Sequence, residues 1–353
     1  MKILIVKLSS LGDVLHTLPV VHDIKKTLPD TQIDWVVERS FADVVKRCQG
    51  VNKVISCELR KWRKAPFNQE TKNAWHVFKA DLQLEKYDAV IDLQGLTKSA
   101  VVAWLAQLSP TGKRFAMANR TEGSSYEAPT RWVADVAIRI EPHIHAVQRA
   151  RDLCAKALNY EMNGTHQKNI KSGLTTVSFS SLAGVFIDDN AITNIAKTVI
   201  FAHGSSREEK LWPIAHWVEL GRRLHEAGLR VALVHGNDEE ESRSQSIAQQ
   251  LPNAHVLPRL GLDALLDALG CSAGVVGVDS GLSHMAVALN LPHVQIYNFD
   301  TAWRTGPLLS SSSSSLSSSS TEPRQLSVYA KPTPNVDDVW HAWQAVNAEK
   351  ATK

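Results

Sequence analysis

Short apolar runs alternate along the chain with segments whose apolar residues follow helical spacing. Val14, Leu18 and Val21, for example, fall at i, i+4 and i+7, which is the spacing of one helix face. Near-continuous apolar runs are typical of strands buried on both faces, and such strands form parallel sheets covered by helices. Seven runs have this character: Ile3–Val6, Ile33–Val37, Ala89–Leu93, Val199–Ala202, Val231–Val234, Gly274–Val278 and Val294–Tyr297. The alternation predicts an α/β fold with doubly wound sheets.

The alternation is interrupted once, between Asn163 and Asp189, where Gly, Ser, Thr, Asn and Gln dominate. Thr175–Phe179 is only a weak strand candidate within this stretch. We therefore predict a linker here and two domains, over residues 1–170 and 171–330. Two parallel sheets joined in this way predict a ligand cleft between the carboxyl ends of their strands.

The chain after residue 330 forms a third segment, over residues 331–353. Trp340, Trp343 and Val346 lie at helical spacing in it, and we expect this helix to pack back on the first domain. The segment Ser310 to Ser320 contains ten serines and one leucine. It has too little apolar surface to offset its chain entropy, so we predict a disordered loop without chemistry.

Composition narrows the class of protein. A length of 353 residues fits two domains that each bury a core, and 44% apolar residues with 21% charged residues is typical of a globular chain. The net charge of +3 argues against a protein that coats nucleic acid along its length. Four cysteines without metal or redox spacing favour a reducing cytoplasm, and no apolar run is long enough to span a membrane.

The first candidate site is the loop that leaves the first strand and enters a helix, Lys7–Pro19. Small residues such as Ser10 and Gly12 let the backbone approach a ligand. Asp13 beside them could act as a general base, because a carboxylate within reach of an acceptor hydroxyl can take its proton. The alternative is that Asp13 caps the first turn of the helix, and spacing alone favours that role.

The second candidate is a cationic cluster around one indole, made of Arg60, Lys61, Trp62, Arg63 and Lys64. Such a cluster can bind several phosphates or carboxylates at once. A short charge run is usually a solvated helix face, but the interleaved Trp62, with Phe67 nearby, favours an amphiphilic anionic partner. Nucleic acid phosphates would satisfy the same cations.

The third and fourth candidates lie in the second domain. His203–Pro213 contains Ser205, Ser206 and Lys210, which could hold phosphate oxygens and neutralise a departing phosphate, although Lys210 could equally pair with Glu208 or Glu209.

After another strand comes Asp279, followed by the start of a helix whose backbone N–H groups, at Ser280, Gly281 and Leu282, could bind a pyrophosphate. His284 there is either a cleft ligand or a buried histidine that Asp279 satisfies.

A further loop, Gly236–Glu241, places carboxylates where the ribose of a nucleotide would lie. The alternative is that these acids stabilise the first turn of a helix. No Asp-x-Asp pair and no His/Cys cluster with metal spacing occurs in the sequence, which gives no support to a metal-bridged diphosphate.

Taken together, these motifs resemble glycosyltransferase family 9, and within it the lipopolysaccharide heptosyltransferases that add the first heptose. The resemblance runs in order along nearly the whole chain, through Val6–Pro19, Arg60–Lys64, Asp92–Ser99, Lys210–Pro213 and Asp279–His284. It implies a GT-B fold, in which two Rossmann-like domains face each other across a cleft. The first domain would bind the acceptor and the second the nucleotide-sugar.

The resemblance also implies an activity. L-glycero-D-manno-heptose would pass from ADP-heptose to the inner Kdo of Kdo-lipid A, with inversion and without a metal or another cofactor. Asp13 would be the base, and Lys210 would stabilise the ADP leaving group. Donor contacts would come from Ser205, Ser206, Glu240, Asp279, Ser280, Gly281, Leu282 and His284, and acceptor contacts from Ser10, Gly12, Arg60, Arg63, Lys64 and Arg120. The enzyme would work peripherally on the cytoplasmic face of a Gram-negative inner membrane, without nucleic acid.

Two alternatives remain open at this point. The chain could be the second heptosyltransferase, which extends the first heptose. It could also be a polyanion-binding module without turnover, which would use Arg60–Lys64 but leave Asp13 and Asp279 without a role.

Overall fold

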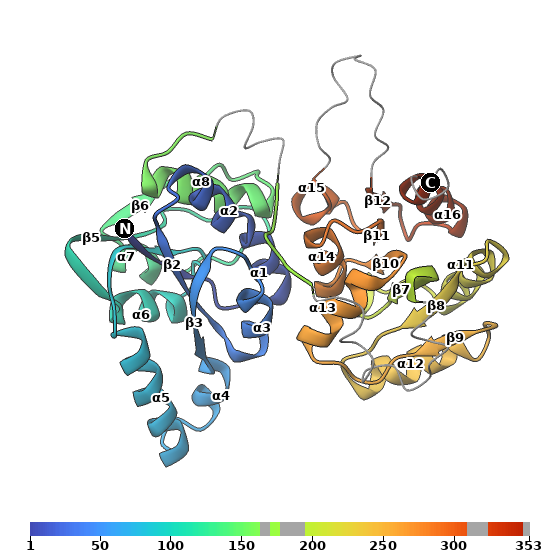
Figure 1. Cartoon of the computed structure of the whole chain (residues 1–353), viewed down its shortest axis with the longest axis horizontal. Helices are drawn as coiled ribbons and strands as arrows, with labels where there is room; N and C mark the ends of the chain where they lie inside the picture. The colour runs from blue at the N-terminus through green and yellow to red at the C-terminus, as the bar shows by residue number, and fades with distance from the viewer. Residues whose placement is uncertain (163–169, 177–194, 309–323, 349–353) are drawn as a thin grey trace. The chain divides into compact units, whose positions relative to one another are not determined.

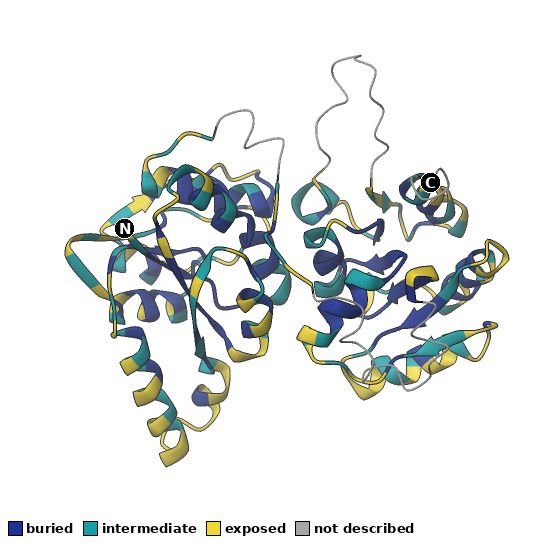
Figure 2. Cartoon of the chain, viewed as in Figure 1, coloured by how far each residue is buried: buried dark blue, intermediate teal, exposed yellow. Residues whose placement is uncertain are grey.

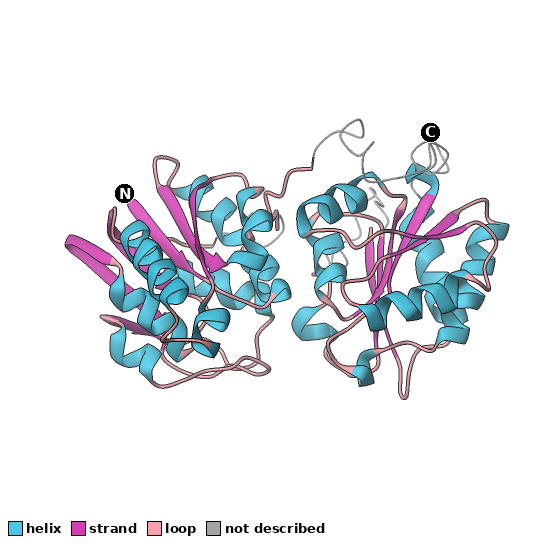
Figure 3. Cartoon of the chain, turned by 90° about the horizontal axis from the view of Figure 1, so that it is seen from below, coloured by secondary structure: helices cyan, strands magenta, loops and turns pink. Residues whose placement is uncertain are grey.

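The computed structural model describes residues 1–162, 170–176, 195–308 and 324–348, and it divides the chain into two compact units, Met1–Thr175 and Thr176–Lys353. Each unit contains a parallel sheet between layers of helices (Figures 1 and 3). Three of the residues in the weak strand candidate, 177–179, and the serine-rich segment Ser310 to Ser320 lie outside the described residues.

The N-terminal unit contains six strands within its described residues, and they lie in the order β3-β2-β1-β4-β5-β6. Their register is parallel throughout, with Ile5 of the central strand facing Trp35 on one side and Ile91 on the other. The strands are β1 (Lys2–Val6), β2 (Gln32–Glu38), β3 (Val51–Cys57), β4 (Lys86–Asp92), β5 (Gln107–Met117) and β6 (Val136–Ile138).

Helices cover both faces of this sheet. On one face α4, α5, α6 and the end of α7 share a core with the sheet, while α1 and α2 pack against α8. The predicted helical stripe is buried, but it spans two helices because Pro19 begins α2 directly after Leu18. The helices are α1 (Leu11–Thr17), α2 (Pro19–Thr27), α3 (Ala42–Lys46), α4 (Leu59–Lys64), α5 (Gln69–Leu82), α6 (Thr97–Leu105), α7 (Pro129–Val133) and α8 (Ala146–Leu158).

The C-terminal unit repeats the same topology. Its described residues form six parallel strands in the order β12-β11-β10-β7-β8-β9. The central strands are almost entirely buried (Figure 2). The strands are β7 (Thr198–Ala202), β8 (Arg230–Leu233), β9 (Ala254–Val256), β10 (Gly274–Val278), β11 (His293–Tyr297) and β12 (Gln325–Tyr329).

One face of this second sheet shares its core with α11, α12 and α16, and α13 and α14 pack together beside the sheet. Within the described residues of this unit the helices are α11 (Ile214–Glu226), α12 (Asp238–Ala248), α13 (Leu262–Cys271), α14 (Gly281–Ala288), α15 (Ala302–Thr305) and α16 (Val336–Asn347).

The C-terminal helix α16 packs in the second unit, so the expectation that it packs on the first domain is wrong. Val339, Trp343 and Val346 belong to the same buried cluster as Val294 and Ile296 of β11. The physical reason is local: α16 follows β12 at the end of the sheet, and its apolar stripe covers the face that β11 and β12 present.

Both sheets have the strand order of the dinucleotide-binding fold. In this fold the strand order reverses at one place in the sheet, called the switch point, and ligands bind there beside the carboxyl ends of the strands. That point lies between β1 and β4 in the first unit and between β7 and β10 in the second. The loops that follow these four strands contain most of the candidate site residues.

A buried ion pair joins α2 to α8 in the first unit. Arg151 donates from Nε to Oδ2 of Asp23 at 2.6 Å and from Nη2 to Oδ1 at 3.2 Å, and both side chains are buried. This bidentate geometry satisfies both carboxylate oxygens, which a charge removed from water requires.

We predict that Arg151→Met lowers the free energy of unfolding of the N-terminal unit by about 3–5 kcal/mol, because the Asp23 carboxylate stays buried without its partner. Urea unfolding followed by circular dichroism measures the change. The exposed pair of Lys46 and Asp43 provides the control, since Lys46→Met is expected to cost at most about 1 kcal/mol. Equal effects of the two substitutions would contradict the role of the buried pair.

Candidate functional site

Asp13 lies in the first turn of α1, directly after the loop that leaves β1. Its Oδ2 accepts hydrogen bonds from the backbone N–H of Ser10, at 3.1 Å, and from the Ser10 hydroxyl, at 3.0 Å. Its Oδ1 lies 3.7 Å from Nζ of Lys7 and 3.9 Å from Nη2 of Arg149. The Asp13 side chain is 38% exposed. Asp13 therefore contacts the start of the helix, as the cap interpretation predicts, and also presents a charged oxygen that solvent can reach.

The surroundings keep Asp13 ionised. Burial opposes ionisation, but the positive charge of Lys7 and the N–H of Ser10 outweigh it, and the pKa of Asp13 lies well below its usual range. Lys7 is itself buried, which lowers the pKa of its ammonium group, and its Nζ donates to the carbonyl of Leu93 at 3.0 Å. The arrangement is a carboxylate held between two cations next to a loop of small residues.

The loop after β4 positions the loop after β1. Oε1 of Gln94 accepts from the backbone N–H groups of Leu8 and Ser9, each at 3.0 Å. Asp92, at the end of β4, accepts from the N–H groups of Gln94 and Gly95, and its burial raises its pKa to about 6. The sequence motif Asp92–Ser99 marked this region, but it did not indicate that the amide of Gln94 fixes the first loop.

The cationic cluster on α4 has a different internal arrangement from the one expected. Arg60, Arg63 and Lys64 are exposed, but Trp62 is buried, with its ring centroid 5.7 Å from that of Trp75 and 5.6 Å from that of Phe78. The interpretation of Trp62 as a contact for an amphiphilic partner is therefore wrong. Its indole attaches a short helix to the core and leaves the cations in solvent.

Phe67, which follows the cluster, is 86% exposed and remains available to a partner.

Lys98 connects the cluster to the first loop. Its Nζ donates to Oγ of Ser9 at 2.9 Å, and its pKa is lowered by burial and by the nearby charge of Arg60, with a smaller effect of Arg63. Cations are thus present from α4 to the Asp13 loop, and the buried carboxylate of Glu38 lies among them. The sequence alone assigned no role to Lys98, but these contacts make it a candidate functional residue.

Arg120 and Gly12 are the remaining candidate residues of the first unit. Arg120 is exposed, and its Nε donates to the carbonyl of Ser124 at 3.3 Å. The next residue, Thr121, accepts from Nη1 of Arg149 at 3.2 Å, so the Arg120 loop is connected through Arg149 to Asp13. Gly12 lies in the first turn of α1 between Ser10 and Asp13. Ser10, Gly12 and Asp13 therefore lie after the carboxyl end of β1, whereas Arg60, Arg63 and Lys64 follow β3 and Arg120 follows β5.

In the second unit Lys210 pairs with Asp279. Lys210 Nζ lies 2.6 Å from Oδ2 of Asp279, and Nε2 of His284 lies 3.4 Å from Oδ1. The alternative in which Lys210 pairs with Glu208 or Glu209 is wrong. Burial alone would raise the pKa of Asp279, but His284 and Lys210 hold it well below its usual range.

A side-chain amide holds the Lys210 loop. Asn298, directly after β11, donates from Nδ2 to the carbonyl of Glu209 at 2.9 Å and to that of Leu211 at 3.0 Å. Its Oδ1 accepts from Thr333 at 2.7 Å. Sequence reasoning missed Asn298, because its partners lie on another loop and no local pattern marks it.

Glu240 joins the loops after β7 and β8. Its Oε2 accepts from the N–H of Gly236 at 2.7 Å, and its own N–H donates to Oδ1 of Asn237 at 2.8 Å. A Cβ at Gly204 would lie 2.6 Å from Oε1 of Glu240, so Gly204 is required for this close approach. Glu240 thus takes part in the first turn of α12, as the alternative reading predicts, and also lies against the loop of Ser205 and Ser206.

The remaining donor candidates surround these groups. Ser205 is partly exposed and Ser206 is exposed in the loop after β7. Ser280 is the N-cap of α14, and Gly281 and Leu282 are its first helical residues, all partly exposed. The first N–H groups of a helix lack partners within the helix, so this position suits an anion.

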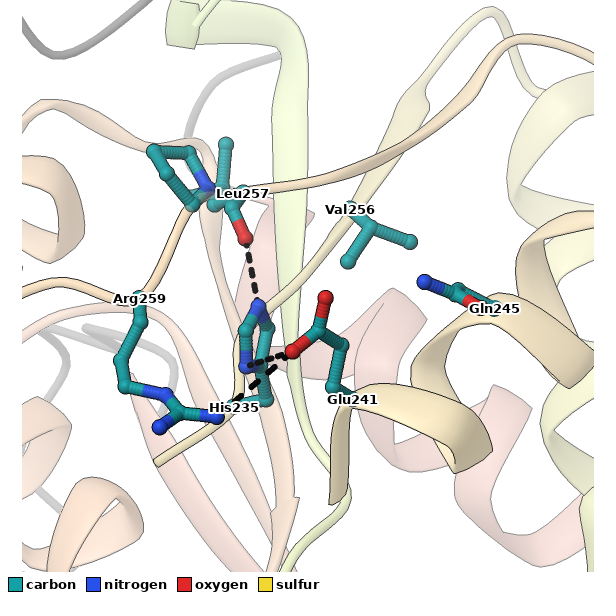
Figure 4. A pocket seen from close by; sticks show the side chains of 7 residues that line it. His235, Glu241, Gln245, Val256, Leu257 and Arg259 are labelled. Carbon is teal, nitrogen blue, oxygen red and sulfur yellow. Dashed lines mark hydrogen bonds and ion pairs between the residues drawn. The ribbon is translucent and has the colours of Figure 1, made fainter. Parts of the chain in front are cut away.

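An open pocket of about 540 Å³ lies beside α12 (Figure 4). Glu241 stands between His235 and Arg259 there, at 3.8 Å and 3.6 Å, and Nε2 of His235 contacts the carbonyl of Leu257 at 3.0 Å. These contacts connect the loops after β8 and β9 with the start of α12. Among the described residues, no group of three or more His, Cys, Asp or Glu side chains could hold a metal ion.

The fold and the two sites define a class. Two doubly wound sheets, each with charged and small residues at its switch point, form the GT-B architecture of glycosyltransferases that use nucleotide-sugars. The profile of glycosyltransferase family 9 (heptosyltransferase) matches residues 75–331. The chain belongs to this family and is a glycosyltransferase, so a binding module without turnover is excluded as its class.

Similar proteins support this assignment. The chain is 36% identical over 301 residues to lipopolysaccharide heptosyltransferase 1 of Escherichia coli K12, a match that covers 84% of this chain and 88% of the relative. The solved structure of E. coli heptosyltransferase WaaC with ADP is 31% identical, covers 99% of this chain and 98% of its own, and gives a TM-score of 0.78. The same enzyme with ADP-2-deoxy-2-fluoro heptose is 30% identical at equal coverage, with a TM-score of 0.74.

Proposed function

We propose that this protein transfers L-glycero-D-manno-heptose from ADP-heptose to the inner Kdo of Kdo-lipid A, in the synthesis of the lipopolysaccharide inner core. The observation that carries the proposal is the pair of ionised carboxylates, Asp13 and Asp279, each beside at least one cation at the switch point of its own sheet. The names of the similar proteins, a heptosyltransferase 1 and a heptosyltransferase bound to ADP or an ADP-heptose analogue, favour this substrate pair.

In this proposal the second unit binds the donor. Lys210 and the start of α14, at Ser280, Gly281 and Leu282, neutralise the diphosphate, together with the hydroxyls of Ser205 and Ser206. Asp279 and His284 bind the sugar side of the donor. Glu240 accepts hydrogen bonds from the ribose hydroxyls, as an acidic residue at this position does in nucleotide folds.

The first unit binds the acceptor. Arg60, Arg63 and Lys64 contact its phosphates and carboxylates, with Arg120 as a further cation and Ser10 and Gly12 lining the loop. Lys98 is a further cation, in contact with Ser9 of the Asp13 loop.

The chemistry is a single displacement with inversion. The Kdo hydroxyl oxygen forms a bond to the anomeric carbon of heptose as the bond from that carbon to the ADP oxygen breaks. The proton passes to the Asp13 carboxylate, and the electron pair stays on the phosphate oxygen, whose charge Lys210 stabilises. Asp13 has a low pKa, so it is a weak base that accepts the proton only once bond formation has made the hydroxyl acidic.

We also propose that the enzyme works peripherally at the cytoplasmic face of the inner membrane, because its acceptor is a lipid. Among the described residues, no helix is long and apolar enough to cross a bilayer.

Mass spectrometry of the reaction products tests the proposed function. Purified protein is incubated with ADP-heptose and either Kdo-lipid A or the same acceptor already carrying the first heptose. We expect a mass increase of one heptose on Kdo-lipid A only. Transfer only to the acceptor that already carries heptose would identify the second heptosyltransferase instead, and transfer to neither would refute the proposal.

We predict that Asp13→Asn lowers kcat by roughly 10²–10⁴-fold, because the amide keeps an oxygen toward Ser10 but cannot accept the proton. Steady-state kinetics with varied ADP-heptose should show little change in the donor KM. The exposed Asp43 on α3 provides the matched control, and Asp43→Asn is expected to leave kcat unchanged. Wild-type turnover of the Asp13 variant would eliminate the base assignment.

We predict that Gly204→Ala raises the KM for ADP-heptose by about tenfold, because the added methyl group displaces the Glu240 carboxylate from its position toward the ribose. Gly261→Ala is the control, since a Cβ at Gly261 meets no atom within 4 Å and its φ of −68° suits alanine. Thermal unfolding should show that both variants fold. An unchanged donor KM in the Gly204 variant would remove Glu240 from the ribose site.

A further inference from the structure

Large apolar side chains are exposed together on two helices of the first unit. Val101 and Trp104 on α6 are 42% and 64% exposed, and Trp132 on α7 is 77% exposed. The opposite sides of both helices pack into the core through Val102 and Val133. The exposed side chains therefore point outward from the same layer, and we call Val101, Trp104 and Trp132 the α6–α7 surface. Exposed apolar groups gathered in this way indicate a binding surface.

The two helices lie side by side and are tied at both ends (Figure 1). At one end the N–H of Thr97 donates to Oε2 of Glu127 at 2.7 Å. At the other end Arg114 donates from Nη2 to the carbonyl of Trp104, at 3.2 Å, and from its backbone N–H to Oδ2 of Asp135, at 2.7 Å. The three apolar side chains thus belong to one fixed surface.

The charge of these helices favours an anionic partner. Within their bounds α6 and α7 contain the cations Lys98 and Arg131 and no carboxylate. The carboxylates at their ends, Glu127 and Asp135, are engaged by Thr97 and Arg114. Thr97 is neutral, so Glu127 keeps its negative charge, whereas Arg114 offsets the charge of Asp135, 4.0 Å away. Two exposed indoles beside two cations and this one uncompensated carboxylate match the interfacial region of a bilayer that contains anionic lipid.

The α6–α7 surface is continuous with the proposed acceptor region. Lys98, Val101 and Trp104 are spaced at i, i+3 and i+6, so each is a surface neighbour of the next, along a row that winds by about 120° around α6. Lys98 donates to Ser9 in the Asp13 loop, and six residues of helix span about 9 Å. A lipid whose headgroup lies at Ser9 and Lys98 would have its hydrocarbon on the side of the two tryptophans.

We propose that the α6–α7 surface docks the enzyme on the membrane, with Trp104 and Trp132 in the interfacial layer of an anionic bilayer. The docking orients the first unit so that a lipid acceptor enters from the bilayer with its headgroup first. The link to the acceptor rests on the proposed function, whereas the docking itself does not.

Sedimentation with vesicles tests the docking directly. The full chain is mixed with phosphatidylethanolamine vesicles that contain phosphatidylglycerol, and with neutral phosphatidylcholine vesicles. We expect the wild type to bind the anionic vesicles, and the double substitution Trp104→Ala and Trp132→Ala to weaken this binding by about tenfold or more. Tyr329→Ala in the second unit, at 41% exposure, is the matched control and should bind like the wild type.

Heptose transfer to two acceptors, one in a membrane and one in solution, shows whether the substitutions affect membrane docking or catalysis. The double variant should show a raised KM for Kdo-lipid A in vesicles and an unchanged kcat/KM for a deacylated, water-soluble acceptor. Unchanged vesicle binding of the double variant would overturn the docking proposal, and so would a wild-type dimer that the substitutions dissociate in analytical ultracentrifugation. Equal losses with both acceptors would also overturn it. Absence of wild-type transfer to either acceptor would refute the proposed function and leave the vesicle result as an independent measure of docking.

Discussion

Both candidate sites depend on one electrostatic constraint, which is that a carboxylate near the end of a parallel strand stays charged only if cations accompany it. Removal from water disfavours the charged form, and a paired cation restores it. Asp13 meets this condition through Lys7 and Arg149, and Asp279 meets it through Lys210, with His284 in contact with its other oxygen. The chain therefore brings anion-binding groups and a negative charge together at each switch point, as the transfer of a sugar from a diphosphate requires.

In both units a side-chain amide fixes the position of a site loop. In each sheet a side-chain amide that follows another strand holds the loop that carries the reactive group. Gln94 follows β4, which is next to β1, whereas Asn298 follows β11, which β10 separates from β7. Gln94 accepts from the backbone of Leu8 and Ser9 in the first unit, and Asn298 donates to the carbonyls on either side of Lys210 in the second. Because an amide can bond two backbone groups at once, it fixes the loop without adding charge beside a charged ligand.

Burial on both faces of a sheet explains which strands could be predicted from the sequence. The seven predicted strands lie in the central parts of the two sheets, where burial on both faces makes the sequence continuously apolar. Outer strands such as β3, β5 and β12 have at most two buried positions each, so no continuous apolar run marks them. Trp62 and α16 were misplaced because a sequence pattern gives the apolar face of a helix but not the surface that this face covers. The contacts of Lys210, Gln94 and Asn298 cross between distant loops, and only the strand order brings them together.

The central claim is that each unit binds one substrate at its own switch point. Hydrogen–deuterium exchange of the full chain tests it most directly, with ADP alone and with a deacylated Kdo acceptor alone. We predict that ADP slows exchange most strongly in residues 203–211 and 279–285, and that the acceptor slows it most strongly in residues 7–13 and 60–64. Strongest protection of residues 7–13 by ADP, or of residues 203–211 by the acceptor, would contradict the claim.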